Sequence, residues 1–268
     1  MCPAVWDGGA EVRVELTVLG SGTSMGVPTI GCHCPVCVSP DPHDKRTRPS
    51  ILLRYEGRAV VVDTTPDFRF QALRFNLDRL DAVLYTHSHA DHILGLDDIR
   101  PFSLPDGKVI PIYGNRPAIE GLRRVFKYVF DGNYPYGGVP LIQDHIVTGP
   151  VQLFGLEFVP VQVLHGRLEV LGFRFGRVAY LTDYNEIPEP SYLLLRDLDV
   201  LFLDALRHEA HPTHMTVEEA LREVEKIQPR RAFFTHIAHD LGHEVTNARL
   251  PEQVRLCYDG MRLEIETD

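Results

Sequence analysis

Residues 87–92 read His87-Ser88-His89-Ala90-Asp91-His92, and this stretch decides how the chain is interpreted. It follows the apolar residues Ala82–Tyr85, which are typical of a buried strand. Side chains alternate along an extended turn, so the first two histidines can point in one direction, while the aspartate and the last histidine face a neighbouring one. This one segment can therefore supply ligands to two metal ions.

Three further residues of ligand type share one context, because each comes directly after a predicted buried strand. His165 follows Val159–Leu164, Asp183 follows Val178–Thr182, and His236 follows Arg231–Thr235. In layered α/β folds, functional sites gather at strand ends. We therefore expect all three residues to join the histidine motif in one site.

The composition fits a soluble α/β domain. The chain has 268 residues, of which 44% are hydrophobic and 24% charged, so it can bury a sizeable core. Strand and helix patterns mix throughout, which favours a layered α/β architecture. We predict one domain over residues 1–268, in which residues 101–150 form an excursion that borders the active site.

Charge and hydropathy limit the partners. The net charge of −10 argues against wrapping a long nucleic acid, although a small anionic substrate remains compatible with it. No apolar run approaches the ~18 residues of a membrane span. Residues 1–11 lack the basic start and apolar core of a secretory signal, so we expect a cytoplasmic protein.

Three of the five cysteines form a tight cluster. Cys32, Cys34 and Cys37 lie in a loop rich in glycine and proline, where passive core cysteines are unusual. Three thiolates at this spacing suit a structural Zn²⁺, which requires a fourth ligand, and His33 is the local candidate. Cys2 and Cys257 are isolated, and the pattern assigns them no role.

The histidine motif and the strand-end residues resemble those of the metallo-β-lactamase superfamily, from Val14 to nearly the C-terminus. The resemblance implies a four-layer αββα sandwich with a dinuclear site between its sheets. It implies that Asp183 bridges the metals and that Asp63, after the strand Ala59–Val62, orients the histidine loop. The implied ligands are His87, His89, His165 and Asp183 for one metal and Asp91, His92, Asp183 and His236 for the other.

Within this superfamily the chain is similar to the phosphoribosyl cyclic phosphodiesterases of the carbon–phosphorus lyase pathway and their relatives. The matching pieces are Gly20–Thr23, Gly26–Pro28, Gly31–Cys34 and Thr235–His239. This resemblance implies that His239, three residues after His236, is the fourth ligand of the structural zinc, and we prefer it to His33. It also implies that His214 is a catalytic histidine. His208 and His211 stay unassigned.

The implied ligands indicate the chemistry. Imidazole and carboxylate suit Zn²⁺, Mn²⁺ or Fe without selecting strongly among them. Two cations ~3.5–4 Å apart can activate a hydroxide between them and hold the attacked oxygens. We therefore predict a phosphodiesterase acting on a small cyclic phosphate or nucleotide-like ester. Asp91 and Asp183 would act through the metals, and His214 would be the general acid.

Three alternatives remain open. The first is an endoribonuclease of the tRNA 3′-processing type, although Arg116, Arg123, Arg124 and Lys127 do not form a long basic arm. The second is a thioester or lactone hydrolase, because a scaffold does not fix its substrate. The third is a metal-stabilised binding protein, which the complete ligand set disfavours. A homodimer is compatible with the sequence, and no membrane partner is expected.

Overall fold

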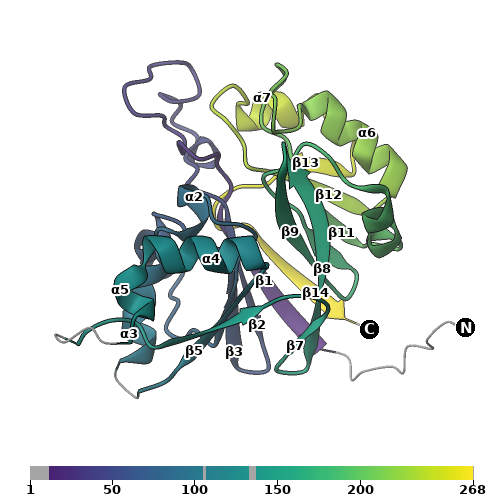
Figure 1. Ribbon diagram of the computed structural model, residues 1–268. Helices are drawn as coiled ribbons and strands as arrows, with labels where there is room; N and C mark the ends of the chain where they lie inside the picture. The colour runs from purple at the N-terminus through teal and green to yellow at the C-terminus, as the bar shows by residue number, and fades with distance from the viewer. Residues whose placement is uncertain (1–11, 105–106, 133–136, 268) are drawn as a thin grey trace, which may run out of the picture.

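The computed structural model describes residues 12–104, 107–132 and 137–267. Within these residues, two seven-stranded β-sheets face each other and helices cover both outer faces (Figure 1). The predicted four-layer αββα sandwich is confirmed. Residues 1–11, which include Cys2 and the segment considered for a secretory signal, lie outside the described residues.

The first sheet has the strand order β14-β1-β2-β3-β4-β5-β6. The alternating sequence of the first strand buries Val14, Leu16 and Val18 on the inner face, as a half-buried strand requires. A hairpin turn at Glu56-Gly57 joins its second and third strands. The strands are β1 (Val12–Gly20), β2 (Ser50–Tyr55), β3 (Arg58–Val62), β4 (Ala82–Leu84), β5 (Ile110–Gly114), β6 (Ile142–Ile146) and β14 (Arg262–Thr267).

The second sheet has the order β13-β12-β11-β10-β9-β8-β7. Its strands β10 to β13 run parallel, so their carboxyl ends meet at one edge of the sheet. The strands are β7 (Val151–Leu153), β8 (Leu156–His165), β9 (Leu168–Phe175), β10 (Val178–Tyr180), β11 (Val200–Asp204), β12 (Arg231–Thr235) and β13 (Val254–Leu256).

Three apolar clusters hold the layers together. One fills the space between the sheets, and each of the others lies between a sheet and its covering helices. Helices α1, α2, α4 and α5 lie on the first sheet, and α6 lies on the second (Figure 1). The helices are η1 (Pro42–Asp44), α1 (Phe68–Arg74), α2 (Ala90–Ile93), η2 (Leu96–Ile99), α3 (Arg100–Ser103), α4 (Arg116–Val125), α5 (Lys127–Phe130), η3 (Glu189–Leu195), α6 (Val217–Ile227) and α7 (His243–Asn247).

The described residues between 101 and 150 contribute to the first sheet and to the helices that cover it. They supply β5 and β6, which extend the first sheet in parallel beyond β4. They also border the histidine loop, because a Cβ atom at Gly121 of α4 would lie 2.3 Å from the Cβ atom of Ser88. Only a glycine at position 121 allows this helix to pack so closely on the loop.

Two helices begin in different ways. Thr216 and Glu219 form a capping box at the start of α6, with both reciprocal hydrogen bonds made. Asp67 precedes α1, but its carboxylate makes no cap and instead pairs with Arg48 at 2.9 Å. No helix in the described part of the chain is long and apolar enough to cross a bilayer.

Candidate metal centre

The histidine motif forms the turn between β4 and α2. His87 precedes the helix, His89 lies at its N-cap, and Asp91 and His92 lie within its first turn. Helix formation therefore turns the last two side chains in a different direction from the first two. His87, Asp91 and His92 are buried, whereas His89 is exposed.

Three residues that follow buried strands have left-handed backbones. Asp63 comes after β3 with φ of 64°, Asp183 follows β10 with φ of 57°, and His236 follows β12 with φ of 59°. This region costs a residue other than glycine about 1–2 kcal/mol, although aspartate tolerates it better than most. Such strain concentrates at functional sites, where the surrounding structure maintains it. All three side chains are buried.

The carboxylate of Asp183 lies at the centre of the predicted ligands. Its Oδ2 atom lies 3.0 Å from Nε2 of His87 and 3.2 Å from Nε2 of His92. Its Oδ1 atom lies 3.0 Å from Nδ1 of His165. His89 and His236 approach Oδ2 to 3.9 and 3.8 Å. The structure thus brings together all seven residues expected to bind the two metals: His87, His89, Asp91, His92, His165, Asp183 and His236.

Three groups of potential ligand atoms share Asp183. One of them combines Asp183 and His236 with Asp204 and His214, and the other two match the predicted metal sites. Of these two, the first has His87, His89 and Asp183, and the second has Asp91, His92, Asp183 and His236; within each, the atoms lie within 4.8 Å of one another. The ring of His165 lies 5.1 Å from that of His89, beside the first group. Its Nδ1 atom also lies 2.8 Å from the carbonyl oxygen of Thr213.

Unpartnered atoms in this cluster fit divalent cations. Several buried nitrogen and oxygen atoms make no hydrogen bond, a state that is costly unless another partner is present. Cations bound by their lone pairs would remove this cost, and imidazole with carboxylate suits zinc, manganese or iron. These atoms are Nε2 of His87, Nε2 of His92, Oδ2 of Asp91, Oδ1 of Asp183 and both ring nitrogens of His236.

Burial and neighbouring charges shift the pKa values of the residues in this cluster in different directions. Burial lowers the pKa of His87 to about 4, so this imidazole is neutral at pH 7 and can act as a ligand. Burial also opposes charge on His236, but the carboxylates of Asp183 and Asp91 outweigh it and raise its pKa to about 9. The imidazoles around Asp183 in turn hold its pKa well below the usual range despite burial.

Asp63 contacts the ring of His92 on the side opposite Asp183. Its Oδ2 atom lies 2.7 Å from Nδ1 of His92, which donates to it and keeps Nε2 directed at Asp183. The same carboxylate accepts hydrogen bonds from the backbone amide and hydroxyl of Thr86, at 2.9 and 2.8 Å. This is the place that the sequence predicted for Asp63, behind the ligands rather than among them.

His214 lies at the edge of the same cluster. Its Nδ1 atom is 2.9 Å from Oδ2 of Asp204 and 3.2 Å from Oδ1 of Asp183. Sequence reasoning gave Asp204 no role, although it ends a buried strand as the other site residues do. The ring of His211 lies 4.8 Å from that of His214, whereas His208 forms an exposed pair with Glu218 at 2.8 Å.

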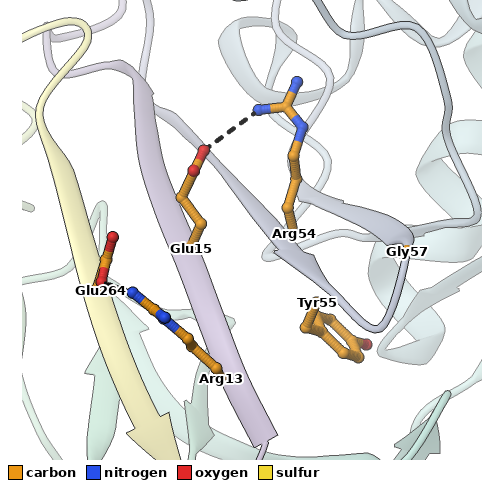
Figure 2. A pocket seen from close by; sticks show the side chains of 6 residues that line it. All are labelled: Arg13, Glu15, Arg54, Tyr55, Gly57 and Glu264. Carbon is orange, nitrogen blue, oxygen red and sulfur yellow. Dashed lines mark hydrogen bonds and ion pairs between the residues drawn. The ribbon is translucent and has the colours of Figure 1, made fainter.

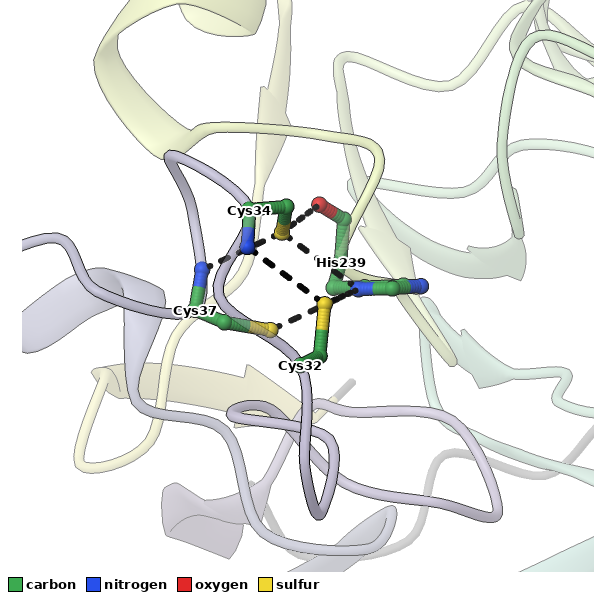
Figure 3. Close-up of side chains that lie close together, drawn as sticks. All are labelled: Cys32, Cys34, Cys37 and His239. Atoms are coloured by element: carbon green, nitrogen blue, oxygen red, sulfur yellow. Dashed lines mark hydrogen bonds between the residues drawn. The ribbon is translucent and has the colours of Figure 1, made fainter.

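The three clustered cysteines meet His239, as Figure 3 shows. The Nδ1 atom of His239 lies 3.2 Å from the sulfur of Cys32 and 3.4 Å from those of Cys34 and Cys37. Typical zinc bond lengths place the nitrogen and sulfur ligands of a tetrahedral site about 3.6 Å apart. His33, the local alternative, is exposed and lies outside this group.

Comparisons with known proteins agree with this geometry. The sequence profile of the Beta-lactamase superfamily domain matches residues 58–237. A crystal structure described as a new diphosphatase from the PhnP family is 52% identical, covers 96% of this chain and 99% of its own, and superposes with a TM-score of 0.91. The chain belongs to the PhnP family of the β-lactamase superfamily. The family and the ligand-type side chains of the site together support a metal-dependent hydrolase domain.

Two curated relatives of this PhnP-family chain are larger proteins. An octanoyltransferase of Porphyromonas gingivalis is 39% identical over 93% of this chain and 51% of its own length. A ribonuclease Z of Clostridium kluyveri is 25% identical over 58% of this chain and 39% of its own length. The chain thus spans about half or less of the length of these relatives.

The PhnP-family chain also has a shallow surface pocket whose lining has no chemistry of this kind (Figure 2). It lies on strands β1, β2 and β14, and its charged side chains are paired with one another. Arg54 lies 3.7 Å from Glu15, and Arg13 pairs with Glu264. The lining of this pocket thus offers no imidazole and no unpaired charged side chain.

Proposed function

We propose that this chain is a dinuclear metal-dependent phosphodiesterase that hydrolyses a small phosphodiester, such as a cyclic phosphate or a nucleotide-like ester. The observation that carries the proposal is the 52% identity, over nearly the whole of both chains, with a PhnP-family diphosphatase. A disubstituted diphosphate and a phosphodiester both present a phosphorus atom with two non-bridging oxygens and one leaving oxygen. One site can therefore be suited to both.

Each group of site residues would have its own role. His87, His89 and His165 would hold one metal, Asp91, His92 and His236 the other, and Asp183 would belong to both. When bound, such a pair of cations lowers the pKa of water and withdraws charge from phosphate oxygens. Asp63 would hold His92 in place through their 2.7 Å contact. The cysteines and His239 would hold a structural zinc ion.

His214 would supply the proton that the leaving oxygen requires. Its Nδ1 atom faces the buried carboxylate of Asp204 at 2.9 Å, so Nε2 is the atom that would donate. The predicted ligands carry lone pairs toward the metals and cannot donate, which leaves His214 as the acid. The carboxylate of Asp204 would orient this ring through that contact.

Two observations bear on the competing functions. A thioester or lactone hydrolase stays the second candidate, because a scaffold does not fix its substrate and the chain matches about half of an octanoyltransferase. Against an RNA-processing role, three of the four cations of α4 and α5 are engaged with carboxylates. Arg116 pairs with Glu120, Arg123 with Asp144 and Lys127 with Asp131.

A substrate panel tests the proposal. Cyclic ribose phosphates, cyclic nucleotides, aryl phosphodiesters and disubstituted diphosphates should be hydrolysed faster than phosphomonoesters or thioesters at equal concentration. A profile dominated by thioesters or lactones would replace the proposal with the second candidate. Cleavage of tRNA precursors that weakens steeply with salt would favour the ribonuclease alternative.

A further inference from the structure

A third group of ligand-type side chains lies outside both sites described above. It consists of His43 from η1 and the adjacent residues His243 and Glu244 at the start of α7. Each offers one potential ligand atom, and the three atoms lie within 4.8 Å of one another. The two segments are 200 residues apart in the chain, so the grouping is a product of the fold.

Buried polar contacts hold the two segments in register. The Oδ1 atom of Asp44 accepts hydrogen bonds from the backbone amide of His243 at 2.8 Å and from Arg46 at 3.0 Å. Arg46, itself fully buried, also donates to the carbonyl oxygens of His43 and Leu241. The backbones that carry both histidines are thus fixed by contacts that do not involve their rings, which preorganises the group.

Ring packing sets the orientation of the two imidazoles. The ring of His43 lies 4.2 Å from that of Tyr258 and 4.5 Å from that of His243. The ring of His243 meets Tyr258 edge-on at 5.6 Å. The Nδ1 atom of His43 lies 3.4 Å from a carboxylate oxygen of Asp41, the kind of outer partner that metal-binding histidines commonly have.

His243 is the member that needs a partner. Only 6% of this residue is exposed, and its Nδ1 atom is buried without a hydrogen bond. Burial, reinforced by nearby His43 and Arg46, lowers the pKa of His243 to about 4, so the ring is neutral at pH 7. A buried, neutral imidazole with an unpartnered nitrogen is the state in which histidine binds metal.

We propose that His43, His243 and Glu244 form an additional site for a transition-metal ion of the Zn²⁺ type. Two imidazoles and one carboxylate suit zinc, copper or nickel better than magnesium or calcium, which prefer oxygen ligands. The charge of the site also suits a cation. Asp44 neutralises the nearby Arg46 through an ion pair, so the negative charges of Glu244 and Asp41 remain to balance the metal ion. The proposal does not depend on the proposed function.

A bound ion would join two segments of the fold, one before α1 and one at the start of α7. The residues before His43 carry Cys32–Cys37, and the residues before His243 carry His236 and His239. An ion shared by His43 and His243 would tie the same two segments that the cysteine cluster joins. It would therefore raise the thermal stability of the region that holds His236 in place.

Zinc titration of the metal-loaded protein tests the site. The protein is first shown by elemental analysis to hold its catalytic and cysteine-bound metals, and Zn²⁺ is then added in a calorimeter. Wild type should bind one further equivalent, with a rise in melting temperature. His43→Gln and Glu244→Gln should each weaken this binding by at least about tenfold, since losing even an outer partner of a metal ligand costs about 10–100-fold.

His208→Gln is the matched control, because it removes one member of a surface histidine–glutamate pair that lacks a second imidazole. It should bind the further equivalent as wild type does. Both test variants alter partly or fully exposed side chains, so the fold should survive. The proposal is overturned if wild type binds no further equivalent, or if His43→Gln and Glu244→Gln bind it unchanged.

Discussion

The Nδ1 atom of His214 lies 2.9 Å from the Oδ2 atom of Asp204, a carboxylate that is completely buried at the end of β11. The other oxygen of Asp204 is buried without a hydrogen-bond partner, and Oδ2 also accepts from the backbone amide of Tyr184. This pairing orients the imidazole at the edge of the histidine and aspartate cluster. Among the predicted ligands, Asp183 also approaches its Nδ1 atom, at 3.2 Å.

His214→Ala should lower turnover of an unactivated phosphodiester by about 10²–10⁴-fold while both catalytic metals stay bound, because a positioned acid contributes about that much. A diester with a nitrophenolate leaving group needs no proton, so its hydrolysis should fall far less. Steady-state kinetics on the two substrates, with elemental analysis, measure this. Asp204→Asn should show the same leaving-group dependence with a smaller loss. Equal losses on both substrates would rule out the general-acid role.

Asp63→Asn should weaken the affinity for the catalytic metals by about 10–100-fold, as loss of an outer partner of a ligand histidine usually does. Asparagine tolerates the left-handed backbone at this position, so the fold should be kept. Competition with a chelator measures the affinity. Asp67→Asn is the control, since Asp67 pairs with Arg48 at the start of α1. Unchanged metal affinity in Asp63→Asn would show that Asp63 has no positioning role.

Cys34→Ser should mainly lower thermal stability and remove one zinc ion per chain, because binding of structural zinc is coupled to folding. Elemental analysis and a melting curve measure the two effects. His33→Ala, in the same loop, should retain both zinc and stability, whereas His239→Ala should behave like Cys34→Ser. Zinc-free wild type with all three thiols freely reactive would contradict the assignment.

Asp183→Asn should instead abolish turnover and loosen both catalytic metals, while the cysteine-bound zinc stays. Asparagine keeps the left-handed conformation but removes the charge that the surrounding imidazoles face. Metal analysis after dialysis and an activity assay measure these effects. Retained activity would show that Asp183 is not shared by the two metals.

Asp81→Asn should cost about 1.5–3 kcal/mol of stability at neutral pH, the usual contribution of hydrogen bonds to a charged group. Burial opposes the charge of Asp81, but hydrogen bonds from Arg79 and Lys108 outweigh it and hold its pKa below the usual range. This stabilisation is present above the unfolded pKa of about 3.9 and is lost as the pH falls through the lower folded pKa.

The difference between wild type and Asp81→Asn, measured by urea unfolding, should therefore shrink from pH 5 toward pH 2. Asp78→Asn is the control, because Asp78 is exposed beside the same Arg79. A difference that stays constant over this range would mean that the lost stability does not come from the ionised carboxylate.

Local chemistry explains what the sequence could predict. Two features depend only on neighbouring residues, so the local sequence is sufficient to predict them. They are the capping box of Thr216 and Glu219 and the hairpin at Glu56. The strand ends that carry Asp183 and His236 were predictable because the strands before them are apolar. Strand β10 nevertheless ends at Tyr180, two residues earlier than Thr182, since the chain leaves the sheet before it reaches Asp183.

Long-range pairing explains what the sequence could not predict. Strand β6 reads Ile-Gln-Asp-His-Ile and is only partly buried at the sheet edge, so its pattern does not mark it as a strand. The partner of His214 depends on where the loop after Asp204 returns to the cluster. The approach of His43 to His243 likewise follows from the packing of η1 and α7, and no spacing rule indicates it.

The positive φ angles of Asp63, Asp183 and His236 mean that glycine would fit the backbone more easily at each position. Screening a library of variants for heat resistance alone would therefore select Asp183→Gly. The selected variants would be stable but unable to turn over substrate. Directed evolution of this enzyme should hold the three strand-end residues constant and select on catalysis, with stability sought elsewhere in the molecule.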